Sequence, residues 1–366
     1  MIYGVKDRAY QLQSLIQGNW FKLICGASYQ HLPTVRSLAL IYSLAGADCI
    51  DVAADKAVIF AAKEGIATAT KLSNSKQKPL LMISLNDDED PHFRKAEFDE
   101  TKCPTDCLRP CESICPAGAI DKTGVIDSLC YGCGRCLPIC PENLIITRSY
   151  VSTPQVVISL IEEMGIEGIE IHTQSGHFEQ FSRLWQTISP VVAKLKVIAI
   201  SCQDAPNVLH YMRSLYTLIT PLPCPLIWQT DGRPMSGDIG AGTTHAAVKF
   251  AKKIIDTNLP GYVQLAGGTN SYTITKLNSA RMLKDWHNND GTNHKKVSGV
   301  AYGSYARSLV LPILEQLETL NNSNNYTTNT LESNPQLLQQ AVVLAHSLVT
   351  QIKTQVPRQV FSNSNQ

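Results

Sequence analysis

The sequence predicts an α/β protein whose body is a TIM-like (β/α)8 barrel carrying a small cysteine-rich insertion. Two observations support this prediction. Short apolar runs alternate with amphipathic segments along most of the 366 residues, and eight of the twelve cysteines lie between Cys103 and Cys140. Near-continuous apolar strands separated by helices are typical of a parallel sheet that is buried on both faces.

Eight strand-helix units can be counted along the chain. Three strands precede the cysteines, at residues 20–25, 47–53 and 79–85, with helices at 34–45 and 56–69. The third helix, at 154–164, follows the cysteines. The remaining strands are expected at 168–172, 197–201, 226–229, 262–265 and 297–301, and their helices at 178–188, 207–217, 244–256, 270–283 and 306–320. Eight units favour a closed barrel with the cysteines on its third strand-to-helix loop, and a doubly wound open parallel sheet is the alternative.

The same pattern divides the chain into five parts. Residues 1–99 form the first part of the barrel, 100–148 a ferredoxin-like module, and 149–320 the remainder of the barrel. Residues 321–334 are rich in Asn, Thr and Ser, which predicts a flexible linker. Residues 335–366 are expected to form a C-terminal helix and tail. Apolar residues recur there at helical spacing, so the helix should pack back on the barrel, and docking to a partner is the alternative.

Composition and charge narrow the class of protein. Thirty-two basic and 31 acidic residues leave a net charge of +1, which gives no basic field for nucleic acid. The first residues lack the apolar core of a signal peptide. The uncharged run 214–230 contains three prolines and falls short of the ~20 residues of a membrane span. With its clustered thiols, the chain is expected to be cytoplasmic, without a membrane span.

The cysteines form two groups, each closed by a Cys-Pro pair. The second group is Cys130, Cys133, Cys136 and Cys140, and its C-x2-C-x2-C-x3-C-P spacing is the run of bacterial ferredoxins. The first group has wider, three-residue gaps and consists of Cys103, Cys107, Cys111 and Cys115. Iron-sulfur clusters are therefore expected, and structural zinc and disulfides are the alternatives.

The ferredoxin run also predicts how the two groups share their ligands. In such a run the fourth cysteine binds the other cluster of a pair. Applied to the last cysteine of the first group, this rule places Cys115 with Cys130, Cys133 and Cys136. Cys140 should join Cys107 and Cys111, with Cys103 as the remaining ligand. Two [4Fe-4S] clusters are expected, and the wider spacing of the first group leaves a [3Fe-4S] cluster open there.

Glycine-rich turns after the seventh and eighth strands predict a second kind of site. Backbone N-H groups at such turns bind phosphate in many barrel enzymes. The candidate residues are Gly267, Gly268, Thr269, Gly303 and Ser304. FMN or another phosphate-bearing ligand would fit, and a flavin could exchange electrons with a cluster. Catalytic residues stay unassigned, because no lysine ends a strand and neither His172 nor His177 has an evident acidic partner in sequence.

Three segments carry a resemblance to a known family. Residues 20–28 (WFKLICGAS), 46–54 (GADCIDVAA) and 90–96 (DPHFRKA) resemble the light-dependent period family of cyanobacteria, and the resemblance extends from Trp20 to about residue 320. It implies an iron-sulfur protein that reports the redox state of photosynthetic electron flow to the circadian clock and adjusts its period to light. It also implies clock input and oscillator proteins as partners, and the eight grouped cysteines as cluster ligands.

Three functions are compatible with these observations. The first is the redox sensor that the resemblance implies, with ferredoxin or a quinone as a candidate electron donor. The second is a flavin-dependent iron-sulfur oxidoreductase with a phosphate-ligand pocket at the C-terminal face of the barrel. The third is an electron carrier that uses the barrel as a docking body. Flavin content and the effect on clock period distinguish the three.

Overall fold

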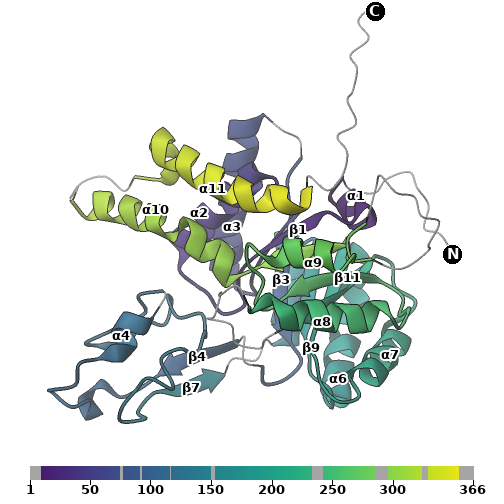
Figure 1. Ribbon diagram of the computed structural model, residues 1–366, viewed down its shortest axis with the longest axis horizontal. Coiled ribbons are helices and arrows are strands. Elements are labelled where there is room, and N and C mark those ends of the chain that lie inside the picture. Colours follow the sequence, from purple (N-terminus) through teal and green to yellow (C-terminus); the bar gives the residue numbers. More distant parts are fainter. Residues whose placement is uncertain are drawn as a thin grey trace, which may run out of the picture.

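A closed barrel of eight parallel strands forms the body of the protein (Figure 1). The computed structural model describes residues 10–74, 77–90, 93–115, 117–149, 153–232, 242–284, 296–323 and 329–353. Around the barrel the strands follow the order β1-β2-β3-β8-β9-β10-β11-β12, and β12 pairs with β1. This last pairing closes the sheet, so the predicted barrel is confirmed and the open sheet is excluded.

The barrel elements lie close to their predicted positions. The strands are β1 (Trp20–Gly26), β2 (Cys49–Ala53), β3 (Leu80–Asn86), β8 (Gly168–His172), β9 (Val197–Gln203), β10 (Leu226–Asp231), β11 (Tyr262–Ala266) and β12 (Gly299–Tyr302). The helices around them are α2 (Leu32–Ala45), α3 (Lys56–Ser73), α5 (Pro154–Met164), α6 (Phe178–Ile188), α7 (Val208–Ile219), α8 (Thr244–Ile255), α9 (Thr273–Ser279) and α10 (Ser304–Ser323), with the 3-10 helix η3 (Ser189–Lys194) after α6. Every residue of β2, β3, β8, β10 and β12 is buried, as their apolar runs predict.

Helix α9 is shorter than the predicted helix at 270–283. The side chain of Asn270 accepts a hydrogen bond from the backbone N-H of Tyr272 at 2.9 Å, which forms a turn before the helix begins. Arg281 adopts a left-handed backbone conformation, with φ at 52°, and the chain leaves the helical path before it. Local hydrogen bonding therefore competes with the helix at both ends.

The N-terminal end of the barrel is closed by α1 (Tyr10–Gln17), a helix that the sequence analysis did not predict. Leu12 and Leu15 of α1 form an apolar cluster with Trp20, Leu80 and Val197 from the strand ends. This cluster, the apolar plug, fills the N-terminal part of the barrel interior. Above it, towards the C-terminal ends of the strands, polar side chains occupy the interior.

The cysteine module is inserted between β3 and α5 and stands to one side of the barrel, below α10 (Figure 1). Its first strand, β4 (Arg94–Glu97), pairs antiparallel with its last, β7 (Ile146–Ser149), so the chain enters and leaves through one two-stranded ribbon. Between them lie η2 (Glu100–Lys102), α4 (Pro110–Ile114) and a hairpin of β5 (Ile120–Asp121) and β6 (Gly124–Val125). The small module core has four buried residues, Cys111, Ile120, Cys136 and Ile145, and partly buried side chains such as Phe98 and Leu137 pack against them. So few apolar side chains leave much of the folding energy to bound clusters.

A buried lysine holds the module against the first barrel loop. Lys95 of β4 is 1% exposed, and its ammonium donates to Gln30 Oε1 at 2.7 Å and to Asp127 Oδ2 at 3.0 Å. The backbone N-H of Gln30 also donates to the carbonyl of Ser128 at 3.2 Å. These bonds fix the segment that leads into Cys130.

Tyr131, next to Cys130, makes a second contact with the barrel. Its ring meets Tyr29 edge-on at 6.0 Å between centroids. The guanidinium of Arg307 on α10 lies 4.2 Å from the centre of the same ring, within the range of a cation-π interaction. Arg307 also donates to the carbonyls of Ile24 at 3.0 Å and Cys25 at 3.1 Å. The cysteine loop, the end of β1 and the start of α10 therefore form one contact.

The C-terminal part of the chain packs back on the barrel. Helix α11 (Pro335–Lys353) contacts α2, α10 and β1, and its Leu348 and Ile352 are buried. Part of segment 321–334, predicted as a flexible linker, is also packed. Leu331 of η4 (Leu331–Ser333) is fully buried, and Glu332 forms an ion pair with Arg36. Residues 324–328 and the predicted tail at 354–366 lie outside the described residues. Within the described ranges, no helix is both long and apolar enough to cross a membrane.

Candidate iron-sulfur site and barrel-mouth cavity

Four thiols from both cysteine groups come together inside the module. Cys115, Cys130, Cys133 and Cys136 line a single small cavity. Burial raises the pKa of the Cys136 thiol to about 12, and the three other thiols raise it further because each would add negative charge nearby. The last cysteine of the first group thus lies with three of the second, in the arrangement that the ferredoxin run predicts.

The surroundings of these thiols fit an iron-sulfur cluster. The backbone N-H of Ala119 lies 3.2 Å from Cys115 Sγ, and that of Ala96 lies 3.4 Å from Cys130 Sγ. Such N-H groups stabilise thiolate ligands and tune the potential of a cluster. Ile120 and Leu137 cover the cavity with apolar side chains. In the described residues no three His, Cys, Asp or Glu side chains lie close enough together to hold a single metal ion.

The other four module cysteines lie in and around α4. Cys103, Cys107 and Cys140 are partly exposed, and Cys111 is buried. Desolvation raises the pKa of the Cys103 thiol, with further contributions from Cys107 and Cys140. The backbone N-H of Arg109 lies 3.4 Å from Cys107 Sγ. The ligand set predicted for the second cluster is therefore gathered in one region, and its assignment stays a prediction.

All twelve cysteines are unbridged. The four outside the module are buried in the barrel and are Cys25, Cys49, Cys202 and Cys224.

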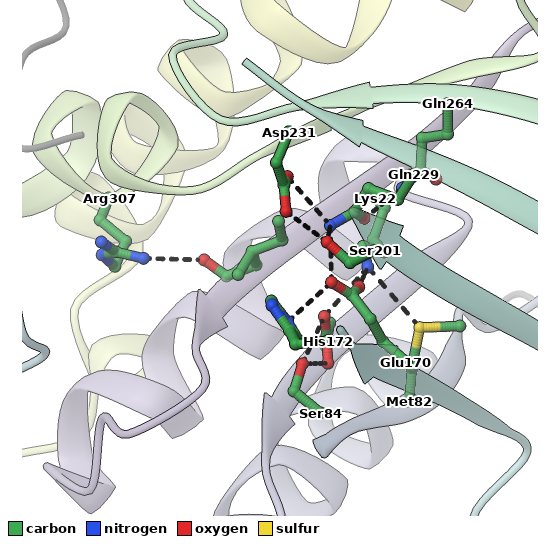
Figure 2. Close-up of polar contacts among 12 residues, drawn as sticks. Lys22, Met82, Ser84, Glu170, His172, Ser201, Gln229, Asp231, Gln264 and Arg307 are labelled. Carbon is green, nitrogen blue, oxygen red and sulfur yellow. Dashed lines mark hydrogen bonds and ion pairs between the residues drawn. The ribbon is translucent and has the colours of Figure 1, made fainter. Parts of the chain in front are cut away.

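A layer of polar side chains crosses the interior of the barrel above the apolar plug (Figure 2). At its centre the ammonium of Lys22, on β1, donates to Asp51 Oδ2 of β2 at 3.0 Å and forms an ion pair with Glu170 of β8. Lys22 and Glu170 are completely buried, and Asp51 is 1% exposed. The hydroxyl of Ser84 on β3 donates to Asp51 at 3.0 Å. Three charges are thus held together where water is excluded.

Glu170 connects this centre to the mouth of the barrel. His172 Nε2 lies 2.8 Å from Glu170 Oε1, and His172 Nδ1 lies 3.9 Å from Asp90. His177 likewise lies 3.3 Å from Asp87. In the sequence, neither histidine had an evident acidic partner. That interpretation is wrong, because both partners of His172 and that of His177 come from the barrel and from the loop after β3.

A hydrogen-bonded chain completes the layer on the opposite side. Gln229 Nε2 donates to Glu170 Oε1 at 2.5 Å, and Gln264 Nε2 donates to Gln229 Oε1 at 2.6 Å. The hydroxyl of Ser201 donates to Asp231 at the end of β10. Figure 2 shows these side chains pointing towards one another from neighbouring strands. Seven of the eight strands therefore contribute a polar side chain to one network.

The pKa values of the network follow from burial and from its charges. Burial lowers the pKa of Lys22, but Asp51 and Glu170 outweigh it and hold the pKa above its ordinary value. Burial also favours neutral Glu170, whereas Lys22 and His172 keep its pKa well below the usual range. Burial raises the pKa of Asp51 to about 7, with Lys22 opposing. The pKa of His172 is about 9, because Glu170, Asp90 and Asp231 outweigh the effect of burial.

The raised pKa of His172 predicts that stability falls as pH rises from 6.5 to 9. His172 has a folded-state pKa of about 9 against an ordinary 6.5, so its stabilisation is complete below pH 6.5 and is lost as pH rises through 9. The loss is roughly 3 kcal/mol. Asp51 acts in the same direction at lower pH, between 3.8 and about 7. Anaerobic urea unfolding should therefore give a lower free energy of unfolding at pH 9 than at pH 6.5.

The substitution His172→Gln should flatten this pH dependence between 6.5 and 9. His210→Gln, at an exposed position of α7, is the matched control and should keep the wild-type slope. An unchanged slope in His172→Gln would show that other groups cause the dependence.

A cavity of about 90 Å³ opens above the polar layer at the C-terminal ends of the strands. Glu170, His172 and Asp231 lie at its floor, and Arg307, Tyr131 and Cys133 line it as well. The five candidate phosphate-site residues also line it, namely Gly267, Gly268, Thr269, Gly303 and Ser304. The structure thus brings every predicted ligand residue of the barrel to one place. Cys133 lines this cavity and the module cavity, so the two candidate sites share a wall.

Gly268 shows why one of these loops requires glycine. Its φ is 87°, a conformation that side chains disfavour, and an added Cβ would lie 2.7 Å from the carbonyl oxygen of Thr243. The loop after β11 therefore packs against the start of α8 at a distance that only glycine permits.

The polar layer was missed in the sequence because each member is one polar residue in an apolar run. A signal was nevertheless present: Lys22, Asp51, Glu170 and Gln264 lie inside predicted strands, and Gln229 is the last residue of one. In a closed barrel, inward-facing residues of neighbouring strands form layers. A polar residue at a similar height in five strands could thus have indicated a shared interior site.

Comparison with known families agrees with the division into module and barrel. Residues 103–151 match the LdpA Fe-S cluster-binding domain, and residues 160–351 match the Light dependent period A C-terminal domain. The chain therefore contains an iron-sulfur-binding domain. Light dependent period A of Synechococcus elongatus is 49% identical over 348 residues, which cover 95% of each chain.

Solved structures give only a weak likeness. The tryptophan synthase alpha chain of Legionella pneumophila is 11% identical, with 95% of this chain and 98% of that chain covered and a TM-score of 0.39. Pyruvate kinase of Cryptosporidium parvum is also 11% identical, with 95% and 74% covered and a TM-score of 0.43. Neither likeness bears on activity. The family is shown by the two domain matches and by the relative from Synechococcus, and the chain belongs to the light dependent period A family.

Proposed function

We propose that this protein is a cytoplasmic iron-sulfur redox sensor that reports photosynthetic redox state to the circadian clock and modulates its period with light. The observation that carries the proposal is the position of Cys133, which lines the module cavity and the barrel-mouth cavity. A cluster there would lie where its charge acts on the barrel. The name of the Synechococcus relative, Light dependent period A, supports the link to light and period.

The sensor would hold two [4Fe-4S] clusters. One would be bound by Cys115, Cys130, Cys133 and Cys136, which surround a cavity. The other would be bound by Cys107, Cys111 and Cys140 with Cys103, and a [3Fe-4S] cluster is the alternative there. The unbridged cysteines support a reducing compartment. Ferredoxin or a quinone is the proposed electron donor, and clock input and oscillator proteins are the proposed partners.

A route for the signal leads through Tyr131. Reduction would add one negative charge to the cluster beside this ring, and Arg307 lies 4.2 Å from the ring centre. A more negative cluster attracts the guanidinium more strongly, whereas the carbonyls of Ile24 and Cys25 hold it to β1. The stronger pull of the reduced cluster on Arg307 would act on α10, which begins three residues before Arg307 and contacts α11. Switches of this kind need a small charge change at a packed contact.

A flavin-dependent iron-sulfur oxidoreductase is the second candidate. The glycine loops and the polar floor of the barrel-mouth cavity favour it, since both suit a bound ligand. The size of the cavity instead favours the sensor. As bounded by the described residues, the cavity measures about 90 Å³, which is below the roughly 300–1,000 Å³ typical of sites for larger ligands such as a flavin. Release of flavin from the denatured, purified protein, measured by fluorescence, would support the enzyme.

The sensor proposal predicts the effect of Cys133→Ser on the clock. In Synechococcus elongatus that carries this chain in place of its own relative, the variant should lose the dependence of period on light intensity. The cause would be the loss of the cluster nearest the barrel. Period is measured with a reporter in dim and in bright light.

Cys224→Ser provides the matched control, because Cys224 is a buried cysteine outside the module. It should keep the light response. A normal response in Cys133→Ser, at equal protein level, would contradict the sensor proposal.

A further inference from the structure

We propose that the barrel-mouth cavity binds a small phosphorylated hydroxy compound, and that this ligand binds more tightly when the cluster at Cys133 is oxidised. The proposal has two halves. The binding half, that the cavity holds such a ligand, is argued from the cavity alone. The redox half rests on the proposed function, because it requires a cluster at Cys133.

One side of the cavity suits an anion. Arg307 lines it and brings a positive charge there, and its Nη2 donates to the hydroxyl of Ser304, another residue of the lining, at 3.1 Å. Gly303 and Ser304 lie at the start of the 20-residue helix α10. The first amide groups of a helix lack partners within it and carry partial positive charge. Gly267 and Gly268 bring a second set of backbone groups to the same cavity. A phosphate group fits this combination of guanidinium and amide donors.

The floor of the cavity suits hydroxyl groups. Glu170 and Asp231 present carboxylates that accept hydrogen bonds, and His172 lies beside them. Asp231 is 4% exposed and His172 is 6% exposed, so both sit in a water-poor environment. Lys22 and His172 offset the charge of Glu170, whereas Asp231 accepts from the uncharged Ser201 and Gln229. Asp231 is therefore the group that repels a phosphate and accepts from hydroxyls, which sets the direction of the ligand. Its phosphate would lie towards Arg307 and its hydroxyls towards Asp231.

The cluster ligand Cys133 links occupancy to redox state. Because Cys133 lines the cavity, one electron added to its cluster places negative charge beside the phosphate and weakens binding. Coupling between two sites is reciprocal, so the bound ligand must also make reduction harder. We expect about tenfold tighter binding to the oxidised protein. For a one-electron couple this corresponds to a fall of about 59 mV in cluster potential at saturation.

Anaerobic calorimetry on the purified holoprotein tests the binding half with three probes. Glycerol 3-phosphate carries both a phosphate and hydroxyls and should bind most tightly. Inorganic phosphate should bind at least tenfold more weakly, and glycerol should show no binding. Absence of glycerol 3-phosphate binding overturns the proposal. Equal binding of inorganic phosphate overturns the role of the acidic floor.

Two variants locate the site. Arg307→Met should weaken glycerol 3-phosphate binding by at least tenfold, and Lys252→Met, at an exposed position of α8, should leave it unchanged. Arg307 also contacts β1 and Tyr131, so a second variant keeps the Arg307 side chain and changes a different residue of the cavity wall. Gly303→Val adds bulk inside the cavity, where an added Cβ would lie 3.6 Å from the Arg307 guanidinium, and it should also weaken binding tenfold. Iron content checks the integrity of both variants. Wild-type affinity in both overturns the assignment of the site.

The redox half is tested by titrating glycerol 3-phosphate into oxidised and dithionite-reduced protein. Equal affinities in the two states overturn the linkage. The variant Cys133→Ser separates this failure from failure of the proposed function. If that variant retains all its iron, no cluster depends on Cys133 and the sensor proposal fails, whereas binding of glycerol 3-phosphate still stands or falls by its own measurement.

Discussion

Replacing Cys115 by Ser is expected to remove roughly half of the iron, because Cys115 would complete the same cluster as Cys130, Cys133 and Cys136. The effect should equal that of Cys133→Ser, and the double variant should lose no more iron than either single variant. Cys107→Ser should instead remove the other cluster. Iron quantification and electron paramagnetic resonance of anaerobically purified protein measure both effects.

Cys202→Ser controls for loss of a buried thiol elsewhere in the barrel and should retain all the iron. If Cys115→Ser and Cys133→Ser together lost twice the iron of either alone, the two cysteines would belong to different clusters. The ligand sets predicted from the ferredoxin spacing would then be wrong.

Replacing Lys22 by Met is expected to lower the free energy of unfolding by about 3–5 kcal/mol, the usual effect of removing one partner of a buried ion pair. Asp51 and Glu170 would both stay in the barrel interior without the ammonium, and both are at most 1% exposed. Urea unfolding followed by tryptophan fluorescence measures this loss, since Trp20 and Trp228 are fully buried in the barrel.

Two further variants identify the cause of that loss. Lys252→Met breaks an exposed pair with Asp256 on α8, at 2.7 Å, and should change stability by less than about 0.5 kcal/mol. Lys22→Met combined with Glu170→Met removes both charges of the central pair and should restore part of the lost stability. A loss below about 1 kcal/mol in Lys22→Met would mean that water hydrates the carboxylates or that they take up protons.

Much of the barrel could be predicted because its signals are local. Helix α5, strand β8 and helix α6 have the predicted bounds, since an apolar run and its flanking residues determine where each begins and ends. The grouping of the cysteines was equally local. Even the glycines after β11 and β12 could be assigned to one cavity, because the C-terminal ends of barrel strands meet at one face.

The polar layer and the contact between module and barrel could not be predicted in this way. Lys22 and Glu170 are separated by 148 positions in the chain, and only closure of the sheet brings them together. Tyr131 lies between two cluster ligands in the sequence, and its contact with Arg307 depends on how the ribbon of β4 and β7 orients the module. Such long-range contacts leave no pattern in the neighbouring sequence.

The ribbon of β4 and β7 has a consequence for how the barrel tolerates its insertion. Strands β3 and β8 are neighbours, so the barrel closes only when the chain on either side of the module is brought together. The entropy of closing a loop grows only with the logarithm of its length, by about 0.6 kcal/mol for each doubling. The inserted module lengthens an ordinary short connection by about four doublings, which raises the free energy of closing the loop by roughly 2–3 kcal/mol. A folded module removes much of this cost because its paired ends already lie side by side. Loss of the clusters would therefore cost the barrel this limited entropic amount and the contacts of Lys95 and Tyr131 with it. Newly made chains could still close the barrel before any iron is delivered.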